Sequence, residues 1–259
     1  MKYYGLIGYP LSHSFSKKYF AEKFEKAHIT GSHYELYPIE NIDGLPDLLK
    51  QNPGLRGLNV TVPHKINVIK YLDWIESGAK EAGAVNCIRI INNDTERAGA
   101  EHHLRLEGYN TDIYGFEMSL KPLLKEQHSS ALVLGDGGAA KAVKCVLAKL
   151  GISYLFVTRK AQSNSLLFTD LTPSDIKQHK LIINTTPVGM SPKIDECPQI
   201  PYEAITGEHL LYDLIYNPEE TLFLKKGAEQ GAVIKNGYEM LILQAEKSWE
   251  IWTEKEEHS

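Results

Sequence analysis

Short β-prone runs alternate with stretches of helical apolar spacing through the first 110 residues. Residues 2–7 (KYYGLI) predict a strand that ends at Gly8 and Pro10. Residues 67–82 carry apolar side chains at helical spacing and predict one helix. By the same criteria we expect helices over 17–27 and 44–51, strands over 34–38 and 57–62, and a hairpin of strands 85–91 and 104–109.

The alternation continues in the second half of the chain, with shorter and more apolar strands. Thr111 and Asp112 offer capping groups for a helix that runs to about residue 127. The predicted strands are 131–134, 153–157, 181–184 and 210–216, with a short run at 232–234, and the predicted helices are 139–150, 222–230 and 238–252. This order predicts an α/β protein with a parallel sheet covered by helices on both faces.

Composition is typical of a globular protein of one or two domains. The chain has 259 residues, and its 42% hydrophobic and 24% charged residues exclude a disordered or collagen-like protein. The formal net charge is −5 and no long basic run occurs, so nucleic acid is not an expected partner.

The cysteines and the apolar runs indicate the class of protein further. Cys87, Cys145 and Cys197 lie far apart without histidines at metal spacing, so neither a disulfide framework nor a metal site is predicted. No apolar stretch typical of a signal peptide or a membrane span occurs. We therefore expect a cytoplasmic protein without membrane association.

A glycine-rich segment joins the predicted strand at 131–134 to the helix that follows it. In LVLGDGGAAKAV (132–143) the glycines would let the backbone approach a pyrophosphate, whose charge would meet the free N–H groups of the helix. A plain tight turn is the alternative for this segment alone.

The end of the next predicted strand favours a particular dinucleotide. A site that prefers NAD has a carboxylate here for the ribose 2′-OH, whereas this chain has Thr158, Arg159 and Lys160. Two cations at this position favour a 2′-phosphate, so the sequence predicts NADP. A solvated basic turn is the alternative.

Four earlier segments place hydroxyl, amide and charged groups at predicted strand ends. They are HSFS (13–16), GLNVTVPHK (57–65), GAVN (83–86) and GYNTD (108–112). Such groups suit a small, polyhydroxylated, anionic ligand. Taken singly, however, the serines and Asp112 could cap helices, the asparagines could stabilise turns, and Lys65 could be a surface lysine.

Eight motifs together resemble the shikimate dehydrogenase family. They are HSFS, NVTVPHK, GAVN, NTD, LGDGGAAKAV, INTTPVGM (183–190), DLIYNP (213–218) and the segment from Gly237 to Gln244, and they occur in the family's order over nearly the whole chain. The resemblance implies reversible, NADP-dependent reduction of 3-dehydroshikimate to shikimate, a step of chorismate and aromatic amino-acid biosynthesis.

The resemblance also implies roles for the residues that match. Lys65 matches the catalytic lysine and Asp112 matches its aspartate partner. Hydride delivery to a carbonyl carbon develops negative charge on the oxygen, and a lysine supplies both a cation and a proton there. Ser14 and Ser16 match residues that bind the substrate carboxylate, and the other matching substrate-binding positions are Asn59, Thr61, Asn86, Tyr216 and Gln244.

For the cofactor and the domains, the resemblance implies the following. The pyrophosphate loop is Gly135, Asp136, Gly137, Gly138 and Ala139, the adenosine-phosphate motif is Thr158, Arg159 and Lys160, and the nicotinamide side has Thr186, Pro187, Leu214 and Gly237. A substrate-binding and catalytic domain comprises residues 1–112 plus 238–259, and a Rossmann-like NADP-binding domain comprises 113–237, so that the C-terminal helix returns to the first domain. We expect a monomer or homodimer with a small-molecule substrate.

Three residues depart from the family's pattern. Lys17 stands where proline usually follows HSxS, Asp136 replaces a small residue, and Thr158 replaces asparagine. A carboxylate at position 136 would repel a pyrophosphate unless its side chain faced solvent.

Two other functions stay open. One is a quinate/shikimate dehydrogenase that uses NAD, and the other is a non-catalytic NADP-sensing paralogue. The presence of both Lys65 and Asp112 argues against the non-catalytic paralogue.

Overall fold

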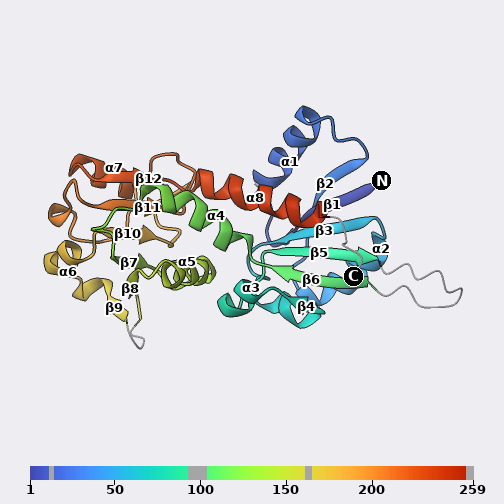
Figure 1. Cartoon of the computed structure of the whole chain (residues 1–259), viewed down its shortest axis with the longest axis horizontal. Helices are drawn as coiled ribbons and strands as arrows, with labels where there is room; N and C mark the ends of the chain where they lie inside the picture. The colour runs from blue at the N-terminus through green and yellow to red at the C-terminus, as the bar shows by residue number, and fades with distance from the viewer. Residues whose placement is uncertain (12–14, 93–103, 161–164, 255–259) are drawn as a thin grey trace, which may run out of the picture. The chain divides into compact units, whose positions relative to one another are not determined.

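The chain divides into two compact units. The computed structural model in Figure 1 describes residues 1–11, 15–92, 104–160 and 165–254. One unit comprises residues 1–111 with 245–259, and the other comprises 112–244. The second boundary therefore lies inside helix α8 (Tyr238–Thr253) and not before it at residue 238, because Met240 of this helix belongs to the core of the second unit.

The first unit is built on a mixed sheet of six strands in the order β2-β1-β3-β5-β6-β4. β1 is parallel to both of its neighbours, and β5 and β6 form the predicted antiparallel hairpin. The strands are β1 (Lys2–Gly8), β2 (Ser32–Pro38), β3 (Leu55–Val60), β4 (Trp74–Ile75), β5 (Cys87–Asn92) and β6 (Leu104–Tyr109).

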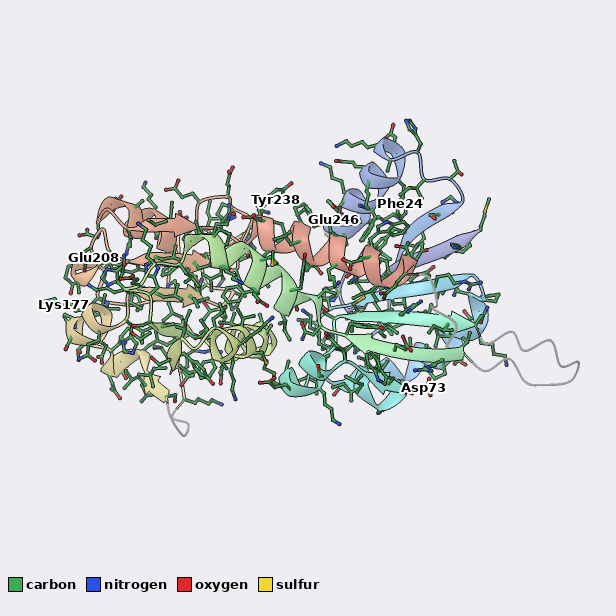
Figure 2. The ribbon with its side chains drawn as sticks, in the orientation of Figure 1. Phe24, Asp73, Lys177, Glu208, Tyr238 and Glu246 are labelled. Carbon is green, nitrogen blue, oxygen red and sulfur yellow. The ribbon has the colours of Figure 1, made fainter. Side chains whose placement is uncertain are left out.

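One face of this sheet is covered by α1 (Phe15–Lys26) and by the last turns of α8. The ring of Tyr4 on β1 lies 5.1 Å from Trp249 and 5.2 Å from Trp252, and the Trp252 indole donates to the carbonyl of Ile88 at 3.0 Å. Lys23 of α1 forms a 2.6 Å ion pair with Glu246, which Figure 2 labels on α8. The last turns of the C-terminal helix are therefore part of the core of the first unit.

The opposite face carries short helices. These are η1 (Ile42–Gly44), α2 (Leu45–Gln51), η2 (Asn67–Tyr71) and α3 (Ser77–Ala82), and they contribute Ile42, Leu45, Leu49, Val68 and Ala79 to a second core cluster.

The single helix predicted over 67–82 is wrong. The chain leaves η2, pairs β4 in parallel with β6, and only then begins α3. Asp73, labelled in Figure 2, accepts a 2.7 Å hydrogen bond from the backbone N–H of Leu106, and its own N–H donates to the Leu106 carbonyl. Pairing with a distant strand thus overrides the local helical spacing.

The second unit is a doubly wound α/β structure. Its six strands are all parallel, in the order β12-β11-β10-β7-β8-β9, so the winding direction reverses between β7 and β10. The strands are β7 (Ser130–Leu134), β8 (Ser153–Thr158), β9 (Ser165–Leu167), β10 (Leu181–Asn184), β11 (Leu210–Asp213) and β12 (Val233–Lys235). In open sheets of this kind, ligands bind outside the carboxyl ends of the strands at such a reversal.

Helices cover both faces of the second sheet. α4 (Thr111–Leu120), α5 (Gly138–Lys149) and the start of α8 pack on one face, and α6 (Pro173–Gln178) and α7 (Leu222–Glu229) pack on the other. α4 ends at Leu120, earlier than predicted, and a short 3-10 turn with Pro122 follows it (η3, Lys121–Leu123). The described residues of this unit also form the 3-10 turns η4 (Phe168–Asp170) and η5 (Tyr202–Ala204).

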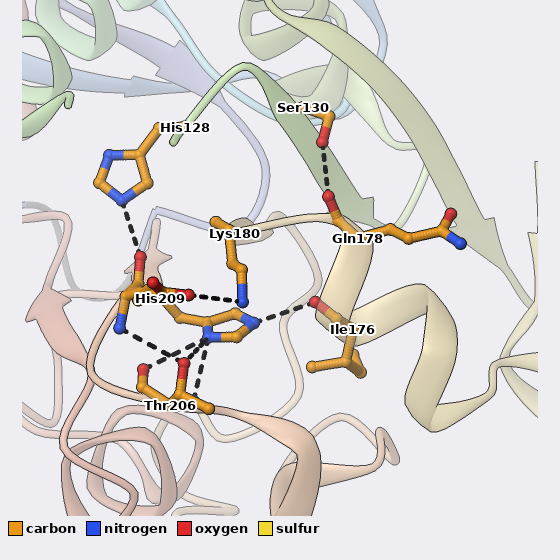
Figure 3. Close-up of polar contacts among 8 residues, drawn as sticks. His128, Ser130, Ile176, Gln178, Lys180, Thr206 and His209 are labelled. Atoms are coloured by element: carbon orange, nitrogen blue, oxygen red, sulfur yellow. Dashed lines mark hydrogen bonds and ion pairs between the residues drawn. The ribbon is translucent and has the colours of Figure 1, made fainter. Parts of the chain in front are cut away.

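Two buried histidines fix the amino ends of the strands in this sheet, as Figure 3 shows. His128 donates through Nε2 to the carbonyl of Glu208 at 3.2 Å. His209 donates through Nε2 to the carbonyl of Ile176 at 2.9 Å and accepts from the N–H of Thr206. Burial lowers the pKa of both imidazoles, which keeps them neutral. These histidines are structural.

None of the helices in the described parts of the chain is long and apolar enough to cross a lipid bilayer.

The lowered pKa of His209 predicts a pH dependence of stability. In the unfolded chain, the His209 imidazole takes up a proton near pH 6.5, whereas in the folded protein it does so only at lower pH. The free energy of unfolding should therefore fall as the pH drops through about 6.5. His209→Gln, which keeps one donor and one acceptor, should reduce this slope by at most about 1.4 kcal/mol per pH unit. Urea unfolding between about pH 5 and pH 7.5 measures the slope. His33→Gln, at an exposed position of the edge strand β2, is the control, and an unchanged slope in His209→Gln would contradict the prediction.

Candidate active site

The loop after β7 has the backbone that close approach to a ligand requires. Gly135 has a φ of +98°, and a Cβ placed on it would lie 2.8 Å from Cγ2 of Thr186. A side chain at this position would be strained and would also collide with the loop that follows β10. The glycine at position 135 therefore allows the loops after β7 and β10 to lie in contact.

The next residues leave room at the start of α5. Among the described residues, nothing lies within 4 Å of a Cβ placed on Gly137 or Gly138, and no described side chain caps the helix at Gly137. The first N–H groups of α5 are thus suited to an anion such as a pyrophosphate. Asp136 is exposed and Ala139 is half-buried, so the carboxylate that departs from the family's pattern lies on the surface.

The turn after β8 presents two cations. Thr158 is buried, and its hydroxyl donates to the carbonyl of Lys160 at 2.8 Å, which shapes the turn. Arg159 and Lys160 are both exposed. Arg159 also lines a pocket of about 560 Å³ together with Thr186, Val188 and Lys226. The structure therefore brings one predicted cation and the loop after β10 to the same pocket.

The residues predicted for the nicotinamide side lie at neighbouring strand ends. Thr186 donates through both its N–H and its hydroxyl to Oδ1 of Asn184, at 3.0 and 2.7 Å, and Pro187 is exposed beside it. A Cβ on Gly237 would lie 2.1 Å from the carbonyl oxygen of Leu214, so only glycine fits where α8 begins. These contacts bring Leu214 and Gly237 together.

A buried carboxyl lies beneath these loops. Asp213, at the end of β11, is fully buried and accepts hydrogen bonds from Asn184, Ile215 and Thr221. Burial raises the pKa of the Asp213 carboxyl to about 6, in opposition to those hydrogen bonds.

In the first unit, Lys65 lies on a loop whose backbone is fixed. The carbonyl of Lys65 accepts from the N–H of Val85 at 2.8 Å, and the neighbouring His64 donates through Nε2 to the carbonyl of Ile39 at 2.6 Å. Thr61 begins the loop, and its N–H donates to the carbonyl of Ile7 at 2.9 Å. The half-buried side chain of Lys65 thus starts from a rigid position.

Asn59 belongs to a buried hydrogen-bond network. Its Oδ1 accepts from the hydroxyl of Tyr34 at 2.8 Å, and its Nδ2 donates to Ser248 of α8 at 2.9 Å. Tyr34 also forms a hydrogen bond with Ser16. The network therefore links two of the predicted substrate-binding residues, Ser16 and Asn59, whereas Ser14 lies outside the described residues.

The same network continues to the start of α4. Oδ1 of Asn86 accepts from the N–H of Thr111 at 2.7 Å, and the Thr111 hydroxyl lies 3.2 Å from that of Ser248. Asp112 follows in the first turn of α4, where a negative charge is favourable. Asn86 therefore fixes the backbone from which Asp112 projects.

Asp112, Tyr216 and Gln244 belong to the second unit. Tyr216 is exposed on the loop after β11, and partial burial of its ring raises the pKa of the phenol. Gln244 is buried on α8 and donates to the carbonyl of Leu241 at 3.0 Å.

Sequence reasoning missed Tyr34, Ser248, Asn184 and Asp213. Asn184 and Asp213 do stand at the ends of apolar strands, and that position is a usable signal for residues at a binding edge. Ser248 had no comparable signal, because one serine in an amphipathic helix is typical of any such helix.

Comparison with known proteins points to one family. Residues 6–88 match the family model described as the shikimate dehydrogenase substrate binding domain. A shikimate dehydrogenase (NADP(+)) of Clostridium beijerinckii is 40% identical over 264 residues, which cover 98% of this chain and 93% of that protein.

Two solved structures show the same fold. A shikimate dehydrogenase in complex with NADP+ superposes with a TM-score of 0.83 at 31% identity, covering 98% of this chain and 90% of that one. The enzyme of Thermus thermophilus, in complex with NADP(H) and shikimate, has a TM-score of 0.81 at 29% identity, with coverage of 98% and 94%. With similarity of this degree over nearly its whole length, the chain belongs to the shikimate dehydrogenase family.

Proposed function

We propose that this protein catalyses the reversible, NADP-dependent interconversion of 3-dehydroshikimate and shikimate, a step of chorismate biosynthesis. The observation that carries the proposal is the presence of Lys65 and Asp112 in a chain that is similar over 98% of its length to a shikimate dehydrogenase (NADP(+)).

Reduction of the ketone adds a hydride to carbon and a proton to oxygen. NADPH, when bound, supplies the hydride. Lys65 holds the proton that the carbonyl oxygen takes up, and in the reverse direction it accepts the proton of the hydroxyl. The ammonium also stabilises the negative charge that develops on the oxygen. Asp112 orients Lys65 and accepts a hydrogen bond from a substrate hydroxyl.

Other residues bind the carboxylate and the ring of the substrate. Ser14 and Ser16 bind the carboxylate, and Thr61, Tyr216 and Gln244 bind the hydroxyl-bearing ring. Asn59 and Asn86 also contact the substrate, and their internal hydrogen bonds support a further role in holding the strand ends to which it binds.

NADP is assigned to the second unit. The open space at Gly137 and Gly138 and the uncapped start of α5 support pyrophosphate binding, with Gly135, Asp136 and Ala139 completing the loop. Arg159 and Lys160 bind the 2′-phosphate on a turn shaped by Thr158. Thr186, Pro187, Leu214 and Gly237 lie on the nicotinamide side.

The first unit is accordingly the substrate-binding domain and the second the NADP-binding domain. The cytoplasmic location and the monomeric or homodimeric state inferred from the sequence stay predictions.

A steady-state assay tests the proposal. Shikimate and quinate are each oxidised in the presence of NADP+ or NAD+, and the formation of reduced cofactor is followed by absorbance. The highest kcat/KM is expected for shikimate with NADP+. A preference for quinate with NAD+ would support a quinate/shikimate dehydrogenase that uses NAD. The absence of turnover with all four pairs would support a non-catalytic NADP-sensing protein.

Removal of the lysine should impair chemistry and not binding. Lys65→Ala should lower kcat by ~10²-fold or more while the KM for shikimate changes little, because a positioned acid and base acts in the transition state. Asp112→Asn keeps the shape of the side chain and should impair turnover as well. Because the two residues act as one unit, the double variant should lose less than the sum of both effects. Near-normal turnover of Lys65→Ala would exclude the lysine from the mechanism.

The choice of cofactor should depend on Arg159. A guanidinium binds a phosphate through two parallel hydrogen bonds that a 2′-OH does not reciprocate. Arg159→Ala should therefore weaken NADP+ by ~1.5–3 kcal/mol and scarcely affect NAD+, as measured by kcat/KM for each cofactor. Equal losses of kcat/KM with both cofactors would show that Arg159 stabilises the fold or stacks on the adenine ring instead.

A further inference from the structure

Asp213 is a buried carboxyl that the reaction proposed above does not use. It stands at the carboxyl end of β11, and its side chain is fully buried. Oδ1 accepts from Nδ2 of Asn184 at 3.0 Å and from the N–H of Ile215 at 3.0 Å, and Oδ2 accepts from the hydroxyl of Thr221 at 2.6 Å. Burial of a carboxyl is costly unless its hydrogen bonds are made, and here both oxygens are occupied.

Oδ1 reaches the loop after β10 through Asn184. The Asn184 side chain donates to Asp213 and accepts both the N–H and the hydroxyl of Thr186 on its own Oδ1, at 3.0 and 2.7 Å. The Thr186 hydroxyl in turn accepts from the N–H of Val188 at 3.3 Å. A continuous chain of hydrogen bonds thus links the carboxyl to the loop beyond the end of β10.

The same oxygen holds the loop after β11 directly. Oδ1 of Asp213 accepts from the N–H of Ile215, which fixes this residue. The N–H of the preceding residue, Leu214, donates to the carbonyl of Asn184 at 3.0 Å. The carbonyl of Ile215 then accepts from the N–H of Gly237 at 3.0 Å. One carboxyl oxygen therefore sets the position of the loop after β10, the loop after β11 and the start of α8.

We propose that Asp213 and Asn184 are positioning residues for NADP, which act by holding the loops of Thr186 and Leu214 at a fixed spacing. This inference rests on the proposed function, because it takes these loops as the nicotinamide side. Hydrogen bonds in a low-dielectric interior are electrostatically stronger than in water, and loops held this way lose little further freedom when a ligand binds.

Thr221 provides an internal control. It binds the other oxygen of the same carboxyl and caps α7 by accepting from the N–H of Leu224 at 3.4 Å. α7 carries none of the residues assigned to the cofactor. Loss of the Thr221 hydroxyl therefore disturbs the carboxyl and the fold without releasing either of the two loops.

The experiment compares four variants for NADP+ binding, measured by titration calorimetry, and for KM and kcat with shikimate. Asn184→Ala and Asp213→Ala should weaken NADP+ binding at least about tenfold while the KM for shikimate stays within about twofold. Asp213→Asn keeps an acceptor oxygen for Asn184 and Ile215 and should stay within about threefold of the wild type. Thr221→Val should lower the Tm but leave NADP+ affinity within about twofold.

Two results would overturn the proposal. One is equal weakening of NADP+ in Asn184→Ala and Thr221→Val at similar Tm, which would assign the whole cluster to stability. The other is wild-type NADP+ affinity in folded Asn184→Ala, a variant that decides the question even where Asp213→Ala does not fold. Titration calorimetry measures NADP+ binding without turnover. If the wild-type protein binds NADP+ but does not oxidise shikimate, the proposed function is wrong. The NADP+ affinities of the variants then still decide the present inference.

Discussion

Buried polar side chains at strand ends must find hydrogen-bond partners, and both candidate binding regions depend on this requirement. Asn59 and Asn86 in the first unit, and Asn184 and Asp213 in the second, all stand where a strand and a loop meet. Each is satisfied by groups of a neighbouring loop or helix. The loops that carry the chemistry are therefore set by the ends of the sheet and not by their own sequence alone.

In the second sheet, this requirement has different results at the amino ends and at the carboxyl ends of the strands. At the amino edge, the imidazole Nε2 atoms of His128 and His209 bind backbone carbonyls, and burial keeps both rings neutral. At the carboxyl edge the buried group is a carboxyl whose partners lead to loops, and Gly137 and Gly138 leave open space at the same edge. The same physical demand thus makes one edge purely structural and the other suited to a ligand.

Much of this organisation could be predicted from the sequence, because it is encoded locally. The alternation of strands and helices, the glycine loop after β7 and the cations after β8 were all visible in neighbouring residues. The helix expected over 67–82 failed because Asp73 and β4 pair with β6, which lies far along the chain. Ser248 and Tyr34 were missed for the same reason, since their partners come from distant strands and helices. The capping box of Thr172 and Asp175, by contrast, was a local signal that could have found α6.

The boundary inside α8 has a consequence for how the protein is made. Tyr4 on β1 packs against Trp249 and Trp252 of α8, which follow the whole second unit in the sequence. During synthesis α1 can cover one part of this face of the first sheet, but the part that packs under α8 has no cover until the second unit has been translated. The second unit needs only the start of α8 and can complete its core first. The first unit, although it begins earlier in the sequence, therefore completes its core only after the whole second unit has been synthesised.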